Sequence, residues 1–144
     1  METLYNELLT VKVSSLGAEL SSISNNNTKQ EYLWQADPAF WKRHSPVLFP
    51  IVGGLRNNEY RNNGIPYTMT QHGFARDMNF ELLYNKPEEV FYQLESNSET
   101  LSKYPFPFLL KIGYRLIENK IEVLWEVQNT GVSTMYFQIG AHPA

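Results

Sequence analysis

Residues 108–128 read FLLKIGYRLIENKIEVLWEVQ, and this stretch decides the fold class. Glu118-Asn119 interrupts two apolar-rich arms at their centre. A period of two is typical of half-buried strands, so the stretch predicts an antiparallel hairpin. In the second arm four apolar side chains fall on one face of the expected strand: Ile121, Val123, Trp125 and Val127.

Short strands are expected along the rest of the chain as well. Asn62-Asn63-Gly64 supplies the positive φ angles of a tight hairpin. Helix is expected as one turn at 98–104, because Pro105 and Pro107 stop its extension, while Phe40-Trp41 is expected in a loop or a short turn of helix. About ten short strands with almost no helix predict an all-β antiparallel sandwich. The further predicted strands are 9–13, 18–23, 31–35, 47–52, 59–61, 65–69, 80–84, 90–95 and 135–139.

Composition narrows the function classes. The chain has 144 residues, of which 42% are hydrophobic and 19% charged, as in a folded globular domain. The net charge of −3 and the lack of a basic block argue against a nucleic-acid partner. With no cysteine, disulfides and thiolate metal sites are excluded. No secretory leader and no membrane-length apolar run is seen, so we expect a soluble cytoplasmic protein without a membrane partner.

The three histidines are candidate chemical groups, because all are expected in loops or at strand ends. His72 is followed by Gly73, and Arg76 lies four residues on; this loop could bind a polyol, or His72 could satisfy buried carbonyls. His142 precedes Pro143, which favours an extended conformation. Its imidazole could act as a general acid, or its orientation could be incidental. His44 follows Lys42-Arg43, which indicates either a solvated loop or an anion or polyol site.

A metal site is not expected. No histidine has a partner at i+2 or i+4, and no His-rich motif is present. Phosphate-loop, dinucleotide and serine-hydrolase motifs are absent too.

Four segments together resemble the aldose 1-epimerase (galactose mutarotase-like) family. They are residues 17–23 (GAELSSI), 45–53 (SPVLFPIVG), 71–77 (QHGFARD) and 140–143 (GAHP). The resemblance covers essentially the whole chain and points to a bacterial branch near the sugar-phosphate 1-epimerases. It implies a supersandwich of antiparallel sheets. It also implies cofactor-free interconversion of the α and β anomers of an aldose or its phosphate.

The resemblance also implies residue roles. His72 would bind the sugar hydroxyls near the anomeric centre, and His142 would protonate the ring oxygen. Arg76 would help to hold the substrate or its phosphate. Arg43 and Arg56 compete for the role of an upstream substrate-binding arginine. Gln71, in the same loop as His72, is a further substrate-binding candidate.

The family's catalytic base is a glutamate near the C-terminus of a chain about twice this length. Glu118, Glu122 and Glu126 all precede His142, so none can be that base by order. We therefore expect residues 1–144 to be the N-terminal part of a single sandwich domain, with little activity alone. Its open strand edges would favour association, including a homo-oligomer. The alternatives are a non-catalytic carbohydrate-binding module and a purely structural or interaction domain.

Overall fold

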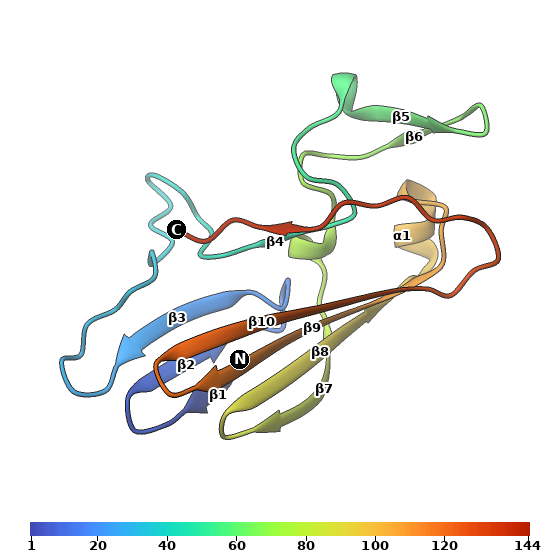
Figure 1. Ribbon diagram of the computed structural model, residues 1–144. Helices are drawn as coiled ribbons and strands as arrows, with labels where there is room; N and C mark the ends of the chain where they lie inside the picture. Colours follow the sequence, from blue (N-terminus) through green and yellow to red (C-terminus); the bar gives the residue numbers. More distant parts are fainter.

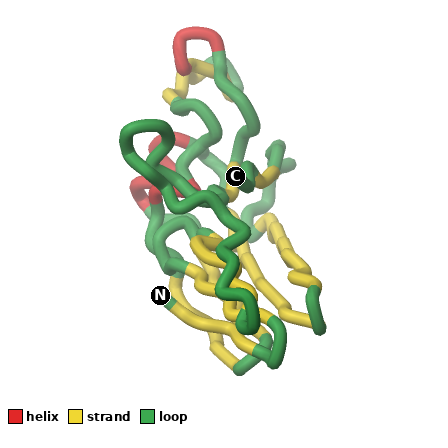
Figure 2. The backbone as a smooth tube through the Cα atoms, turned by 90° about the vertical axis from the view of Figure 1, so that its left-hand side faces the viewer, coloured by secondary structure: helices red, strands yellow, loops and turns green.

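Two antiparallel sheets form the body of the molecule. The structure is a computed structural model that describes residues 1–144. Figures 1 and 2 show both sheets in the same half of the molecule. The smaller sheet has the order β1-β2-β3, and the larger has the order β10-β9-β8-β7. Their strands are β1 (Glu2–Tyr5), β2 (Leu9–Val13), β3 (Leu20–Asn25), β7 (Glu81–Lys86), β8 (Glu89–Glu95), β9 (Phe108–Ile117) and β10 (Lys120–Asn129).

The predicted all-β sandwich is confirmed, as is the hairpin at 108–128. In that hairpin Lys120 pairs with Ile117 across the turn, and the pairing continues without a break to Asn129 and Phe108. Strand β1 was not predicted from the sequence. It pairs with β2 from Glu2 opposite Val13 onward, and its backbone joins the sandwich edge.

The core lies between the two sheets. Alternate side chains of β9 are buried from Phe108 to Leu116, and alternate side chains of β2 are buried opposite them. Two buried tyrosines also tie the sheets together by hydrogen bonds. The Tyr92 hydroxyl donates to the Val13 carbonyl at 3.2 Å, and the Tyr114 hydroxyl donates to the Ala18 carbonyl at 2.8 Å. The sheets are therefore joined by directed contacts as well as by apolar burial.

A smaller region lies beside the sandwich. The hairpin of β5 (Glu59–Asn62) and β6 (Ile65–Thr68) stands at the far end of the molecule, next to the short helix η1 (Arg56–Asn58) (Figure 1). Between hairpin and sandwich, β4 (Val47–Leu48) pairs antiparallel with β11 (Gly140–Ala141). The other helices are η2 (Ala75–Asp77) and α1 (Ser98–Lys103). None of these helices has the length and apolar content that a membrane span requires.

Three strand predictions were wrong in extent or existence. Residues 31–35 form only a single bridge, Ser24 with Glu31. The Glu31 carboxylate accepts the backbone N–H groups of Ile23 and Leu33 at 2.8 and 3.0 Å, so a side chain replaces the ladder there. Residues 47–52 pair over β4 and through one further parallel bridge, Phe49 with Gly73, after which Pro50 follows. Residues 135–139 are not a strand; pairing begins at Gly140.

One face of β10 is open. Its register places Val123 opposite Tyr114 and Trp125 opposite Ile112, on the side of the sheet that elsewhere faces the core. Yet Val123 is 45% exposed and Trp125 39% exposed. Because β10 is also the edge strand of its sheet, the sandwich is uncovered on this side.

Candidate functional site

The short strand β4 gathers the candidate residues. After it, the Phe49 carbonyl accepts the backbone N–H groups of Phe74 and Ala75, at 3.0 and 3.2 Å. Before it, the Pro46 carbonyl accepts the backbone N–H of His142 at 3.1 Å. Two segments far apart in sequence therefore meet on opposite sides of one strand. The imidazoles of His72 and His142 lie with ring centroids 6.5 Å apart.

His72 is fixed by two hydrogen bonds to Gly53. Its backbone N–H donates to the Gly53 carbonyl at 2.7 Å, and its ring Nδ1 accepts the Gly53 N–H at 2.9 Å. Because Nδ1 is an acceptor here, the neutral ring carries its proton on Nε2. Burial lowers the pKa of His72 below its usual 6.5, and the positive charges of Arg76 and His142 lower it further. The geometry thus favours a neutral imidazole with one free N–H donor.

Gly73 is what lets this loop approach β4. Its φ is +73°, and a Cβ at this position would overlap the Phe49 carbonyl. Only glycine combines this backbone conformation with so close an approach. The His-Gly pair is therefore one structural unit, in which the glycine allows the position of the histidine.

His142 is held differently. No protein group forms a hydrogen bond with its imidazole, and the residue is exposed. Its ring packs on the indole of Trp41, with centroids 4.9 Å apart and the planes tilted by 52°. The only hydrogen bond that holds the residue is the one from its backbone N–H to Pro46.

Arg43, Arg76 and Gln71 are brought together beside His72. Arg43 Nη2 lies 2.7 Å from Asp77 Oδ1, and Arg43 Nη1 donates to the Arg76 carbonyl at 3.4 Å. Arg76 Nη2 donates to the Gln71 carbonyl at 2.6 Å. Gln71 takes part through its backbone, and its side chain is exposed. These bonds brace the 71–77 loop.

Arg76 has one unsatisfied group. Its Nε is buried without a hydrogen-bond partner, 3.8 Å from Asp77 Oδ2. Burial lowers the pKa of Arg76, and the neighbouring Arg43 adds to that effect, while Asp77 and Glu19 oppose it. A partly desolvated guanidinium with an unused donor is suited to a polar ligand.

Arg56 is not part of this group. It lies in η1, next to β5, and its exposed side chain forms no hydrogen bond or ion pair. Both views show η1 at the far end of the molecule (Figures 1 and 2). Of the two competing upstream arginines, the structure places Arg43 beside Arg76.

Two residues near the site were missed from the sequence. Trp41 was expected only as part of a loop or short turn, and its contact with His142 depends on chain segments about a hundred residues apart. Glu19 is buried, and its Oε1 accepts the backbone N–H groups of His44 and Ser45 at 2.8 and 2.9 Å. Glu19 could have been found from the sequence, because it is an acidic residue inside the predicted strand 18–23. His44 is thus tied to the loop through its backbone.

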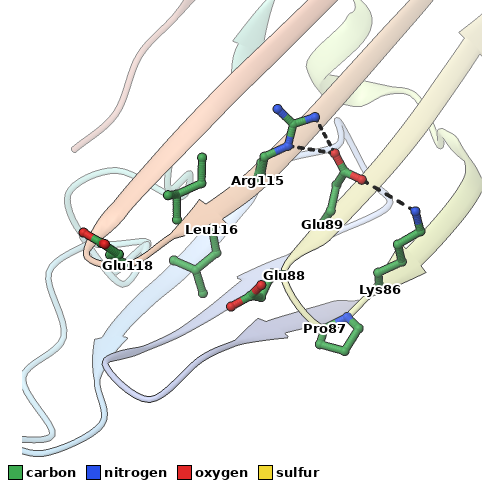
Figure 3. Close-up of a pocket in the computed structure, with 8 residues that line it drawn as sticks. Lys86, Pro87, Glu88, Glu89, Arg115, Leu116 and Glu118 are labelled. Carbon is green, nitrogen blue, oxygen red and sulfur yellow. Dashed lines mark hydrogen bonds and ion pairs between the residues drawn. The ribbon is translucent and has the colours of Figure 1, made fainter.

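A cavity of about 490 Å³ lies elsewhere, at the turns of the larger sheet (Figure 3). Its central carboxylate, Glu89, is already engaged by Arg115 at 2.7 Å and approached by Lys86 at 4.0 Å. The cavity contains no histidine. The histidine cluster therefore remains the candidate site.

Comparison with known proteins adds independent evidence. The sequence model of the family described as aldose 1-epimerase matches residues 2–144. The LacX proteins of Lactococcus lactis subsp. lactis, chromosomal and plasmid, are 40% identical over 147 residues, which cover 98% of this chain and 49% of LacX. The chain thus spans about half the length of the curated relatives it matches.

Solved structures agree with this relationship. A galactose mutarotase related enzyme from Lactobacillus acidophilus is 42% identical with a TM-score of 0.97, over 98% of this chain and 47% of that one. A galactose mutarotase-like protein from Lactobacillus casei is 37% identical with a TM-score of 0.96, over 99% of this chain and 49% of that one. Slr1438 of Synechocystis is 27% identical with a TM-score of 0.88, over 98% and 52%.

Proposed function

Because this chain belongs to the aldose 1-epimerase family, we propose that it serves the interconversion of α and β anomers of an aldose or aldose phosphate. One observation carries the proposal: two imidazoles from distant segments converge to 6.5 Å beside a braced pair of arginines. Opening a cyclic hemiacetal needs a base for the anomeric hydroxyl and an acid for the ring oxygen. Each positioned group contributes about 10²–10⁴-fold.

The two histidines would have separate roles. Neutral His72 offers its Nε2–H to a hydroxyl near the anomeric centre, in keeping with its lowered pKa. His142 donates a proton to the ring oxygen as the ring opens. A pyranose stacked between two rings needs about 7–8 Å between their centroids. The two imidazoles are 6.5 Å apart and inclined by 58°, so in this proposal the sugar would contact the edges of both rings rather than stack between them.

The catalytic base has no candidate among the carboxylates near the site. Asp77 pairs with Arg43, and Glu19 accepts two backbone N–H groups. Glu122 and Glu126 pair with Arg115 and Lys111, at 3.4 and 2.8 Å. Their register places them on the face of the sheet away from the core.

We therefore propose that a carboxylate from outside residues 1–144 acts as the base. In this proposal, residues 1–144 are the N-terminal part of one sandwich and are nearly inactive alone. The length of the relatives supports it, since the chain covers 49% of LacX.

The lack of a free carboxylate near the two histidines favours one alternative function. With an acid and a hydrogen-bond donor but no free carboxylate beside them, the site of this chain alone could bind a sugar without converting it. This is the behaviour of a non-catalytic carbohydrate-binding module.

Sugar titration followed by NMR tests the proposal. We expect galactose, glucose or glucose 6-phosphate to shift the imidazole signals of both His72 and His142. His72→Asn and His142→Asn serve as assignment controls. Polarimetry of a fresh α-anomer then separates enzyme from module: equilibration above the buffer rate, lost in His142→Asn, indicates catalysis. If none of the three sugars shifts either signal, the proposed function is wrong.

A further inference from the structure

The two imidazoles of the site are oriented by different kinds of contact. A hydrogen bond from Gly53 to Nδ1 fixes the ring of His72. The ring of His142 has no such bond and is oriented only by packing. Since a general acid must point its N–H at one atom of the substrate, whatever orients His142 matters for its chemistry.

Trp41 provides that packing from a frame tied to the same segment. The Trp41 backbone N–H donates to the Asp37 carbonyl at 2.9 Å, and the Trp41 carbonyl accepts the indole N–H of Trp34 at 2.8 Å. The Trp34 backbone N–H in turn donates to the Ala144 carbonyl at 2.8 Å. The indole of Trp41 and the segment carrying His142 are therefore parts of one hydrogen-bonded frame.

Further bonds close this frame on its other side. The Ala144 N–H donates to the His44 carbonyl at 3.2 Å, and the His142 N–H donates to Pro46. The buried Glu19 carboxylate accepts the backbone N–H groups of His44 and Ser45 and so fixes this part of the chain as well. The backbone of segment 142–144 is thus held by hydrogen bonds along its length. The orientation of the His142 ring is not fixed by these bonds and depends on its packing against Trp41.

We infer that Trp41 is a positioning residue of this site: its indole holds the His142 imidazole at the angle from which it reaches the sugar. The inference rests on the proposed function for what His142 does with its proton. The contact itself, at 4.9 Å between centroids, does not depend on that function.

NMR of the histidine side chains tests the contact directly. In the unchanged chain we expect the ring current of Trp41 to displace the His142 signals. Trp41→Leu should move them toward the values of an unpacked histidine and leave the His72 signals in place. Trp41→Phe, which keeps an aromatic face, should give an intermediate position. Trp125→Leu is the matched control, because Trp125 lies on β10 and makes no aromatic contact with either histidine.

A merely structural role for Trp41 predicts another result. In that case Trp41→Leu would disturb His72 and His142 alike, or would leave both unchanged, and either outcome overturns the inference. If Trp41→Leu does not fold, Trp41→Phe decides: signals of His142 identical to those of the unchanged chain would show that the indole does not set its orientation.

Sugar binding gives a second readout. The galactose-induced shift of the His142 signal reports the affinity for galactose. We expect Trp41→Leu to lower this affinity on the order of 10-fold. Trp41→Phe should restore most of the affinity. If the unchanged chain shows no sugar-induced shift, the proposed function fails while the ring-current result still decides the role of Trp41.

Discussion

His72 has an environment that disfavours its charged form. Burial is the main cause, and the cations Arg76 and His142 add to it, so its pKa lies below 6.5. We expect an NMR titration of the His72 imidazole to have its midpoint below 6.5. Arg76→Gln removes one positive charge and should raise the midpoint. A midpoint at or above 6.5 in the unchanged chain would contradict the neutral-donor role of His72.

The same lowered pKa couples stability to pH. The unfolded chain takes up this proton near pH 6.5, whereas the folded chain takes it up only at lower pH. The contribution of His72 is therefore complete above pH 6.5 and is lost as pH falls toward its folded pKa. Urea unfolding across this window should show the slope, and His72→Asn should reduce it.

Gly73 offers a sharper test of local geometry. Gly73→Ala places a methyl group against the Phe49 carbonyl in a left-handed conformation. Backbone strain costs about 1–2 kcal/mol, and the overlap adds about 1–3 kcal/mol. Gly64→Ala is the matched control, because Gly64 has φ +81° but nothing within 4 Å of its Cβ position. Equal losses of unfolding free energy in the two variants would show that the approach of the loop to β4 is not tight.

At the scale of elements, the contact between the two sheets depends on buried hydroxyls. The Tyr114 hydroxyl donates to the Ala18 carbonyl at 2.8 Å, and burial raises the pKa of this phenol. Tyr114→Phe leaves that carbonyl unpaired and should cost about 1–3 kcal/mol. Tyr5→Phe, on an exposed ring with no side-chain hydrogen bond, should change stability by less than about 0.5 kcal/mol. Chemical denaturation of both variants measures the difference.

Strands could be predicted where alternation of side chains alone determines them. Residues 108–128 and the Asn-Gly hairpin are of this kind, because each pairs with its sequence neighbour. Strand prediction failed where the pairing depends on a partner distant in the sequence, or where a side chain takes the place of a backbone partner. The strand at 140–141 exists only through β4, and Glu31 replaces a ladder with its own carboxylate.

The candidate site follows the same division. The QHGFARD and GAHP motifs identified His72 and His142, and the structure brings the two rings together. The sequence could not decide between Arg43 and Arg56, since that depends on where Asp77 lies. It also missed Trp41, because the contact with His142 exists only once β4 and β11 have paired.

At the scale of the whole molecule, the sandwich is closed on one side and open on the other. Edge strand β10 has a row of unpaired backbone groups beside apolar side chains on its core-facing side. Val123 and Trp125 are 45% and 39% exposed there. An edge of this kind is a template for pairing with a further strand. A further segment of a longer chain and a second copy of this chain would both satisfy it.

We therefore expect the 144-residue chain on its own to associate through β10. Trp125→Lys places a charge on this face and should shift the chain toward monomer, as light scattering over a range of concentrations would show. Val132→Lys is the matched control, because Val132 is fully exposed in a loop outside the sheet. A chain that stays monomeric at every concentration, or that responds equally to both lysines, would show that the open face does not drive association. β10 presents a strand edge and an apolar face together. A loss of association in Trp125→Lys but not in Val132→Lys would therefore locate the interface on the open side of the sandwich, at β10.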